Sequence, residues 1–200
     1  MLAIYKKELR SYFTSMIGYV FISLFLAIIG VYFYIYNLVN RAANFEYTVA
    51  NVSFIFVLLV PLLTMRIMAE ENRQKTDQLL LTSPVTAADI VLGKFFAVFT
   101  ILFMVVAVIS TYPLIMSRFG EVPYASAYAS LFGFLLLGGA YLAMGLYLSS
   151  LTESQVVAAV ITFIVFFITL FMDNIAKSIS TGSKSAFIFF TVLILIICFI

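Results

Sequence analysis

Charged side chains that could do chemistry are concentrated in residues 70–94, EENRQKTDQLLLTSPVTAADIVLGK. This segment holds seven of the 20 Lys, Arg, Asp and Glu residues in a chain of 200 residues. Glu71 and Lys75 are four residues apart, and so are Arg73 and Asp77, so each pair can stabilise an exposed helix by about 0.2–0.5 kcal/mol. The spacing therefore predicts a helix with a charged, water-exposed surface.

The motifs of several enzyme classes are absent from the sequence. Gly93-Lys94 resembles the end of a phosphate-binding Walker loop, but Ala88 stands where that motif has its first glycine, and Phe95 stands where it has Ser or Thr. The chain has no histidine and a single cysteine, Cys198, which excludes histidine-based zinc sites and catalytic triads. No GxSxG motif occurs either. We therefore expect a non-catalytic chain that itself binds no metal and no cofactor.

The composition is typical of a membrane protein. Apolar residues make up 64% of the chain and charged residues 10%, whereas soluble globular proteins contain roughly 25% charged residues. The chain has too few polar side chains to cover a surface in water, so its main solvent is the lipid bilayer. The net charge of +2 is small and does not indicate a nucleic-acid partner.

The runs between charged residues give the expected spans. A transmembrane helix needs roughly 20 apolar residues, and five runs meet or approach that length: 11–40, 47–65, 95–117, 122–152 and 154–172. A sixth run, 185–200, is short because the sequence stops inside it, without the polar residues that normally flank a span. We therefore predict an all-α polytopic membrane protein with five complete transmembrane helices and a truncated sixth, forming a single domain over residues 1–200. We also expect the sequence to be part of a longer chain.

The distribution of basic residues predicts the orientation. With the N-terminus in the cytoplasm, the inside segments hold seven of the 11 Lys and Arg residues, and the outside loops hold the other four. Cytoplasmic loops of membrane proteins have the excess of positive charge. The sequence therefore favours a cytoplasmic N-terminus and a cytoplasmic charged segment, with Lys94 at the membrane surface.

Helix-capping signals divide the charged segment. Proline suits the first position of a helix and serine suits its N-cap, so one helix is expected to end near Leu81 and the next to begin at Pro84, after Ser83. Thr86 and Asp89 have the spacing of a capping box and provide an alternative start. Both starts predict a helix, a break, and a second helix that leads into the third span.

Two features within the spans bear on packing. Proline inside a helix can kink it, and Pro61 and Pro113 lie within the second and third spans. Small residues let membrane helices approach closely. The fourth span contains four of them, Gly138, Gly139, Ala143 and Gly145. We expect them to pack helices within one subunit, or alternatively to form a contact between subunits.

The charged segment is longer than a connection between two spans requires, since the turn near Glu153 needs only a few residues. Its charged and apolar patches suit a docking surface for a cytoplasmic partner. The alternative is an amphipathic segment that rests on the lipid headgroups.

The residues of this segment also resemble a known family. Glu70-Glu71, Thr76, Leu79-Leu80-Leu81-Thr82-Ser83-Pro84-Val85-Thr86 and Asp89-Ile90-Val91-Leu92-Gly93-Lys94 are similar to the cytoplasmic loop of type 2 ABC exporter permeases, in particular the gliding-motility-associated and NosY-like permeases. The stretch YKKELRSYF at residues 5–13 is similar to the interface helix with which those proteins begin. Lys75 stands where the family usually has glycine, a departure that concerns the local turn.

The resemblance implies the membrane subunit of an ATP-driven exporter in a bacterial inner or plasma membrane. Such permeases form homo- or heterodimers and bind two cytoplasmic ATPase subunits, which hold ATP and Mg²⁺. The resemblance further implies a coupling loop over residues 66–89, docked on the ATPase, and an interface helix over residues 1–13 along the membrane surface. The implied coupling residues are Glu70, Glu71, Arg73, Thr76, Asp77, Thr82, Ser83 and Pro84. The implied interface-helix residues are Lys6, Lys7, Glu8 and Arg10.

Two other functions stay open from the sequence. The chain could anchor a non-ATPase cytoplasmic partner to the membrane through the same segment. It could also be a passive channel or an ion-coupled carrier, although no charged residue lies in the middle of a predicted span, where ion-coupled carriers place theirs. The sequence does not identify the transported substrate.

Overall fold

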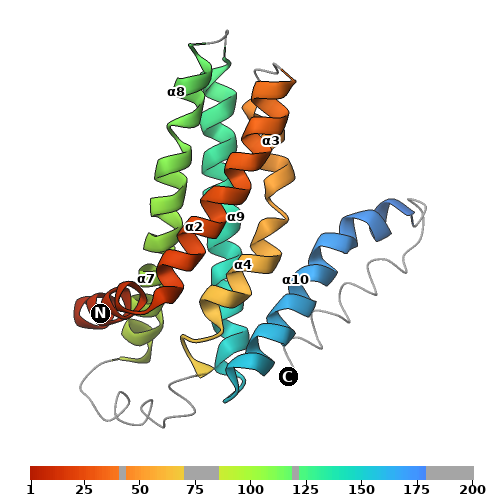
Figure 1. The fold of residues 1–200 in the computed structure, drawn as a ribbon. Coiled ribbons are helices and arrows are strands. Elements are labelled where there is room, and N and C mark those ends of the chain that lie inside the picture. Colours follow the sequence, from red (N-terminus) through yellow and green to blue (C-terminus); the bar gives the residue numbers. More distant parts are fainter. Residues whose placement is uncertain (41–43, 70–85, 119–121, 179–200) are drawn as a thin grey trace.

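The computed structural model describes residues 1–40, 44–69, 86–118 and 122–178, and this part of the chain contains helices and no strands. The predicted all-α class is confirmed for these residues. The helices are α1 (Leu2–Thr14), α2 (Met16–Phe33), the π-helix η1 (Tyr34–Val39), α3 (Phe45–Val52), α4 (Ile55–Thr64), α7 (Ala87–Ile109), α8 (Tyr112–Met116), α9 (Tyr124–Ser150) and α10 (Gln155–Ser178). Most of them run side by side as an elongated bundle (Figure 1).

Helix length and composition identify the membrane spans. Three continuous stretches are long and apolar enough to cross a membrane: Met16–Val39, Ala88–Met116 and Tyr124–Ser150. The α3–α4 pair, bent by 53° at its break, is a fourth if it counts as one span. The apolar stretch Gln155–Phe171 of α10 is shorter, and the expected sixth run, 185–200, lies outside the described residues. The chain is thus a multi-pass membrane protein, with three or four spans in its described part where the sequence predicts five and a truncated sixth.

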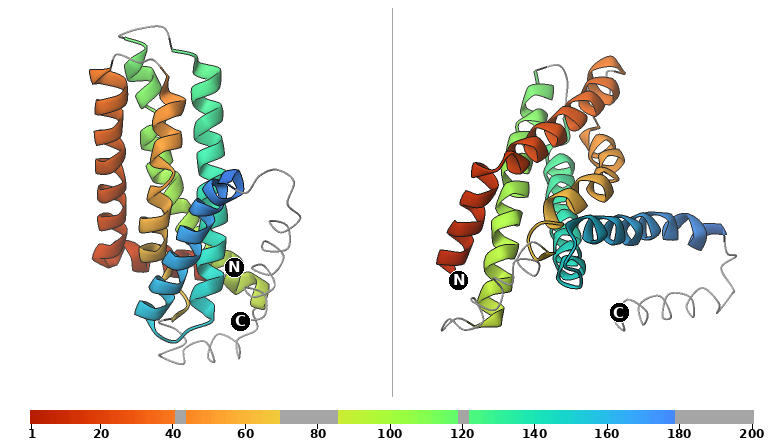
Figure 2. Two further views of the ribbon diagram at one scale, coloured as in Figure 1. Left: turned by 90° about the vertical axis from the view of Figure 1, so that its right-hand side faces the viewer. Right: turned by 60° about the horizontal axis from the view of Figure 1, so that its bottom comes forward.

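Helix α1 is separate from the first span. Ser15 has an extended backbone, with φ −85° and ψ 152°, and ends α1. Gly18 permits the turn that follows, because a Cβ at this position would lie only 2.8 Å from the Tyr12 carbonyl oxygen. Helix α1 therefore lies across one end of the bundle, which we call the N-terminal end (Figures 1 and 2). The charge-free run 11–40 is accordingly not one helix, since residues 11–14 belong to α1.

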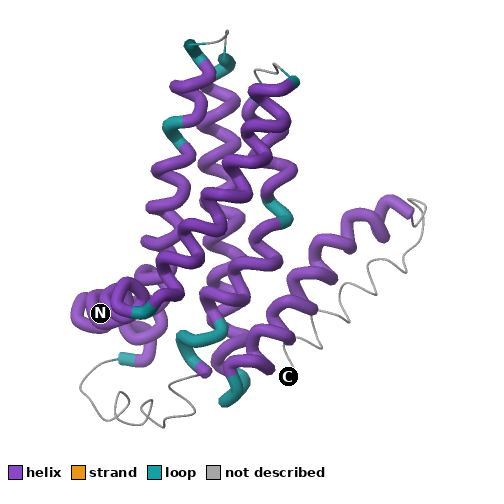
Figure 3. The backbone as a smooth tube through the Cα atoms, in the orientation of Figure 1, coloured by secondary structure: helices purple, strands orange, loops and turns teal. Residues whose placement is uncertain are grey.

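The second span bends at a serine and not at the proline predicted to kink it. Helices α3 and α4 are separated at Ser53 and Phe54, where the teal loop interrupts the helix in Figure 3. Ser53 Oγ donates to Val49 O at 2.9 Å, and such bonds compete with the helix backbone. Pro61 lies inside the uninterrupted α4. Pro113, in contrast, is in the first turn of α8, directly after the break between α7 and α8, a position that suits proline.

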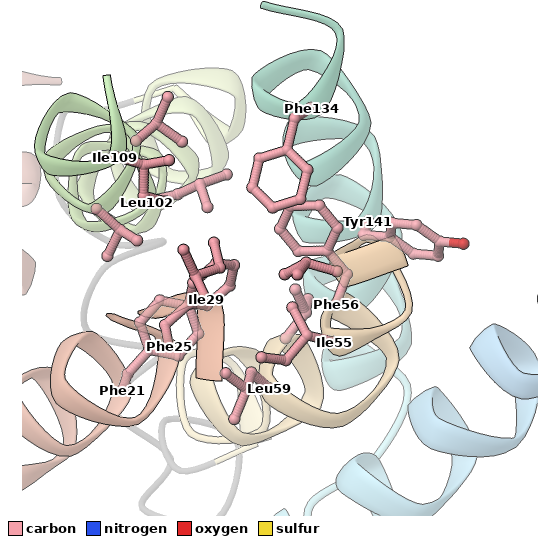
Figure 4. Close-up of a cluster of buried hydrophobic side chains, with 14 of the residues drawn as sticks. Phe21, Phe25, Ile29, Ile55, Phe56, Leu59, Leu102, Ile109, Phe134 and Tyr141 are labelled. Atoms are coloured by element: carbon pink, nitrogen blue, oxygen red, sulfur yellow. The ribbon is translucent and has the colours of Figure 1, made fainter. Parts of the chain in front are cut away.

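Large aromatic side chains fill the centre of the bundle (Figure 4). Phe25 of α2, Phe56 of α4 and Phe134 of α9 are buried, and the Phe56 ring centroid lies 5.7 Å from that of Phe25 and 4.5 Å from that of Phe134. Tyr141 of α9 contacts both Phe56 and Phe166 of α10, with centroids 6.0 and 4.6 Å away. Helix α10 packs on α4 and α9 and diverges from them toward its C-terminal end (Figures 1 and 2).

Candidate functional site

The N-terminal end of the bundle gathers buried polar side chains. This end contains α1, residues 65–69 after α4, the start of α7 and the end of α9 (Figure 1). Glu8, Lys94 and Ser149, from three different helices, are all buried here. Polar groups that are removed from solvent must find hydrogen-bond partners, so the contacts of these three side chains define the site.

Lys94 of α7 holds the segment that follows α4. Its side chain is 1% exposed, and Nζ donates to Ile67 O at 3.1 Å and lies 3.3 Å from Met68 Sδ. A buried ammonium group is tolerated only where such partners offset the loss of water. That Lys94 lies at the depth of the membrane surface stays a prediction. The structure shows that its side chain turns into the protein and joins α7 to residues 65–69.

Ser149 of α9 holds the same segment from the other side. The residue is fully buried, and its Oγ accepts bonds from the N–H groups of Met68 and Ala69 at 3.4 and 3.3 Å. It donates in turn to Met65 O at 3.4 Å. These bonds tie the backbone of residues 65–69 to α9. Ser149 is not among the residues predicted from the sequence, because a serine at the end of an apolar run is also what a short turn requires.

Glycines let α9 approach its neighbours. A Cβ at Gly138 would lie 2.6 Å from Leu102 Cδ2 and 2.8 Å from Phe56 Cζ, and one at Gly145 would lie 2.6 Å from Thr64 Oγ1. At Gly139 the nearest atom, Phe99 Cε2, would be 3.1 Å away. The predicted packing glycines thus face α4 and α7 within one chain. Ala143, the fourth predicted packing residue, is exposed.

One face of α1 packs on the bundle. Ile4, Glu8 and Tyr12 are spaced four residues apart and are buried, as expected for one side of an amphipathic helix. Tyr12 Oη donates to Leu63 O of α4 at 2.7 Å. Gly93 of α7 makes room for α1, because a Cβ there would lie 3.2 Å from Ile4 Cβ.

The opposite face of α1 is basic. Lys6, Lys7 and Arg10 are exposed, whereas Glu8, the fourth predicted interface-helix residue, is 8% exposed. Lys7 Nζ lies 3.7 Å from Glu8 Oε1, so one cation partly compensates the buried carboxylate. Helix α1 therefore presents positive charge away from the bundle while its apolar side holds it in place.

The start of α7 follows the second of the two predicted capping patterns. Thr86 is the N-cap, and its Oγ1 accepts from the Asp89 N–H at 3.3 Å. The same hydroxyl donates to Asp89 Oδ2 at 2.8 Å. The alternative start at Thr86 is thus confirmed, and α7 begins at Ala87 and not at Pro84.

The predicted coupling residues lie outside the described residues. They are Glu70, Glu71, Arg73, Thr76, Asp77, Thr82, Ser83 and Pro84. The structure describes what lies on either side of them: Ala69, which is fully buried, and Thr86, which is exposed. In the described part of the chain, no group of three or more acidic or Cys side chains could hold a metal ion.

Comparison with known proteins adds one finding to this geometry. Residues 2–190 match the family model described as ABC-2 family transporter protein. No curated protein and no solved structure matches the chain. The match covers nearly all of the sequence, including α1, the described spans and the charged segment between α4 and α7.

Proposed function

Because the chain belongs to the ABC-2 family of transporter proteins, we propose that it is the permease subunit of an ATP-driven exporter whose ATP is hydrolysed by a separate cytoplasmic ATPase chain. Within this proposal it resembles the gliding-motility-associated and NosY-like permeases most. It functions as a homo- or heterodimer in a bacterial inner or plasma membrane, with its N-terminus in the cytoplasm. Its residues 70–84 dock on the ATPase, which holds the ATP and Mg²⁺.

The observation that supports the proposal best is the double attachment of residues 65–69. Lys94 bonds this segment to α7 and Ser149 bonds it to α9. Helix α4 continues directly into the same segment. A force applied at residues 70–84 would therefore reach three membrane helices at once, which is what coupling between an ATPase and a transport pathway requires.

The position of α1 agrees with the same proposal. The helix rests on α7 through Ile4 and on α4 through Tyr12, and it exposes a basic face at the same end of the bundle. A basic amphipathic helix with these features suits the boundary between a membrane and water. In the proposed complex α1 lies along the cytoplasmic membrane surface beside the docked ATPase.

Coupling in this arrangement is mechanical. ATP binding draws the two ATPase subunits together, and residues 70–84 move with the subunit on which they dock. The bonds of Lys94 and Ser149 keep residues 65–69 from moving independently of α7 and α9. The displacement is therefore passed to the helices of the bundle. Because these helices are closely packed, they move together as one body.

The proposal is tested by purifying the tagged full-length chain from native membranes in a mild detergent. We expect an ATPase with a Walker A motif to copurify and to hydrolyse ATP, and to be lost when residues 70–84 are scrambled. The paired substitution Glu70→Ala with Glu71→Ala should uncouple hydrolysis from transport without blocking membrane insertion. Arg118→Ala is the control and should change neither result. It removes an exposed charge two residues after α8, which lies at the opposite end of the bundle (Figure 1).

Two outcomes would contradict the proposal. A main copurifying partner without a nucleotide-binding motif would favour a membrane anchor for a different cytoplasmic protein. Flux through liposomes that contain only this chain, independent of nucleotide, would favour a channel or carrier.

A further inference from the structure

A basic hollow lies where α1 turns into α2. It has a volume of about 600 Å³ and is lined by Lys7, Arg10, Ser11, Thr14, Ser15 and Arg66. Three of these residues are cationic and three have hydroxyl groups. Glu8 lies 3.7 Å from Lys7 Nζ, but it is itself buried and does not line the hollow. The lining is therefore suited to an anion with several acceptor oxygens, such as a phosphate group.

An apolar groove is lined by residues next in sequence to those of this hollow. It runs between α2 and α4, encloses about 180 Å³, and is lined by side chains that are all apolar, among them Met16, Val20, Leu24, Leu59, Leu62 and Met65. Several of these side chains are exposed on the outside of the bundle. In a membrane, this surface faces the hydrocarbon region and can accept only an apolar occupant.

The linings of the hollow and the groove meet at two pairs of consecutive residues. At one pair the lining changes from Ser15 to Met16, and at the other from Arg66 to Met65. Met16 is also the first residue of the first span. The change from basic to apolar lining therefore falls at the end of the spans, which is the depth of the lipid headgroups.

We propose that the hollow and the groove together form a binding site for one anionic phospholipid, with its phosphate between Arg10 and Arg66 and an acyl chain along α2 and α4. A free anion would use the hollow but leave the groove without a function. A peptide would bring backbone polar groups into the hydrocarbon region, where each unsatisfied group costs several kcal/mol. Only a lipid has a phosphate and an apolar chain joined at the depth where the lining changes.

The inference goes beyond the transport function and does not depend on it. It requires only that α2 and α4 face lipid and that the basic residues lie at the interface. A bound lipid would join α1 to the first two spans, because its headgroup would contact α1 and its chain would contact α2 and α4. The bound lipid thus helps to hold α1 against α2 and α4.

Native mass spectrometry of the full-length chain in detergent tests the proposal. Phosphatidylglycerol and phosphatidylcholine with the same acyl chains are added in equal amounts, and retained adducts are counted. Each Lys or Arg at an anionic membrane surface strengthens binding by about 1 kcal/mol, which is about fivefold. We therefore expect Arg10→Gln with Arg66→Gln to abolish the preference for phosphatidylglycerol. Lys6→Gln with Arg118→Gln removes the same charge outside the hollow and should preserve it.

A second pair of variants tests the groove. Val20→Phe fills it and should lower retention of phosphatidylglycerol, whereas Leu58→Phe enlarges an equally exposed residue of α4 that does not line the groove and should not. If Arg10→Gln with Arg66→Gln fails to fold, Arg10→Gln alone serves, since that side chain is exposed. Equal retention of both lipids by the unmodified chain would overturn the proposal. Displacement of the lipid by inorganic phosphate alone would also overturn it, because it would identify a simple anion site.

Discussion

The two ends of the bundle both bury polar side chains, but these side chains bond to different kinds of groups. At the N-terminal end, Lys94 and Ser149 bond to the backbone of residues 65–69. At the opposite end, Thr48 Oγ1 donates to the side chain of Asn37 at 2.5 Å, and both residues are buried. Lys94 and Ser149 thus hold a segment that leaves the bundle, whereas the Thr48–Asn37 pair joins α3 to η1 through side chains alone.

A second pair at the opposite end follows the same rule. Ser126 Oγ of α9 donates to the carboxylate of Glu46 of α3, again side chain to side chain. Such pairs fix the alignment of two helices. Because both partners are side chains, both can be replaced at once by apolar residues. A bond between a side chain and the backbone cannot be removed in this way, because the backbone group stays when the side chain is substituted. In the proposed transporter, the N-terminal end transmits force and the opposite end maintains the packing of η1, α3 and α9.

The largest effect is expected where α9 touches α4 beside the double attachment. Gly145→Ala places a Cβ 2.6 Å from Thr64 Oγ1 and 2.9 Å from its Cγ2, so the Thr64 side chain or one of the two helices must shift. Overpacking of this kind typically destabilises by about 1–3 kcal/mol. Gly133→Ala is the matched control in the same helix, because nothing lies within 4 Å of a Cβ there. Thermal unfolding in detergent should show a lower midpoint for Gly145→Ala alone, and equal midpoints would contradict the close contact.

The next largest effect is expected at Lys94, and comparing it with a change at the opposite end tests whether the two ends of the bundle differ. Lys94→Met leaves Ile67 O without its donor, and an unsatisfied buried group costs about 1–3 kcal/mol. The paired change Asn37→Leu with Thr48→Val removes both partners of the bond at the opposite end and should cost less, since neither of these two side chains is left without the other. In the proposed complex with an ATPase, Lys94→Met should also reduce transport per ATP hydrolysed, whereas the paired change should not. A loss of coupling in both variants would mean that the two ends do not differ in function.

A smaller effect is expected at Ser149. Ser149→Ala removes three long hydrogen bonds to residues 65–69 and should destabilise that segment by about 1 kcal/mol. Amide hydrogen exchange of residues 68 and 69 should become faster, because their N–H groups lose an acceptor. Ser130→Ala removes only a bond to Ala127 within α9 and is the control. Unchanged exchange in Ser149→Ala would show that Lys94 alone holds the segment.

Much of the architecture follows from the sequence because lipid imposes a simple rule. Backbone groups in the bilayer must bond within a helix, so charge-free runs of sufficient length predict the spans. The positions of the breaks could not be predicted in the same way. The bend at Ser53 depends on a hydroxyl that bonds its own helix, and other serines, such as Ser130, make similar bonds inside an unbroken helix.

The candidate site was less predictable for a related reason. Lys94 follows a polar segment and precedes an apolar run, which is also the position of a lysine at the membrane surface. Its burial depends on Ile67, 27 residues away, and that of Ser149 depends on Met68, 81 residues away. Contacts between residues so far apart in the sequence cannot be predicted from the spacing of neighbouring residues. Signals that act within one helical turn, such as Thr86 and Asp89, could be predicted because both partners are adjacent in the sequence.

That local signal gives the smallest expected effect and tests how firmly the start of α7 is fixed. Thr86→Ala removes the acceptor of the Asp89 N–H, and the loss of an N-cap typically costs about 1 kcal/mol. Thr86→Ser retains the hydroxyl and should behave as the unmodified chain. Amide exchange in the first turn of α7 should become faster in Thr86→Ala only, while Lys94, two turns further along, keeps its bond to Ile67. If Thr86→Ala instead weakens coupling as much as Lys94→Met does, the attachment of residues 65–69 depends on the first turn of α7, and the N-terminal end acts as one cooperative unit.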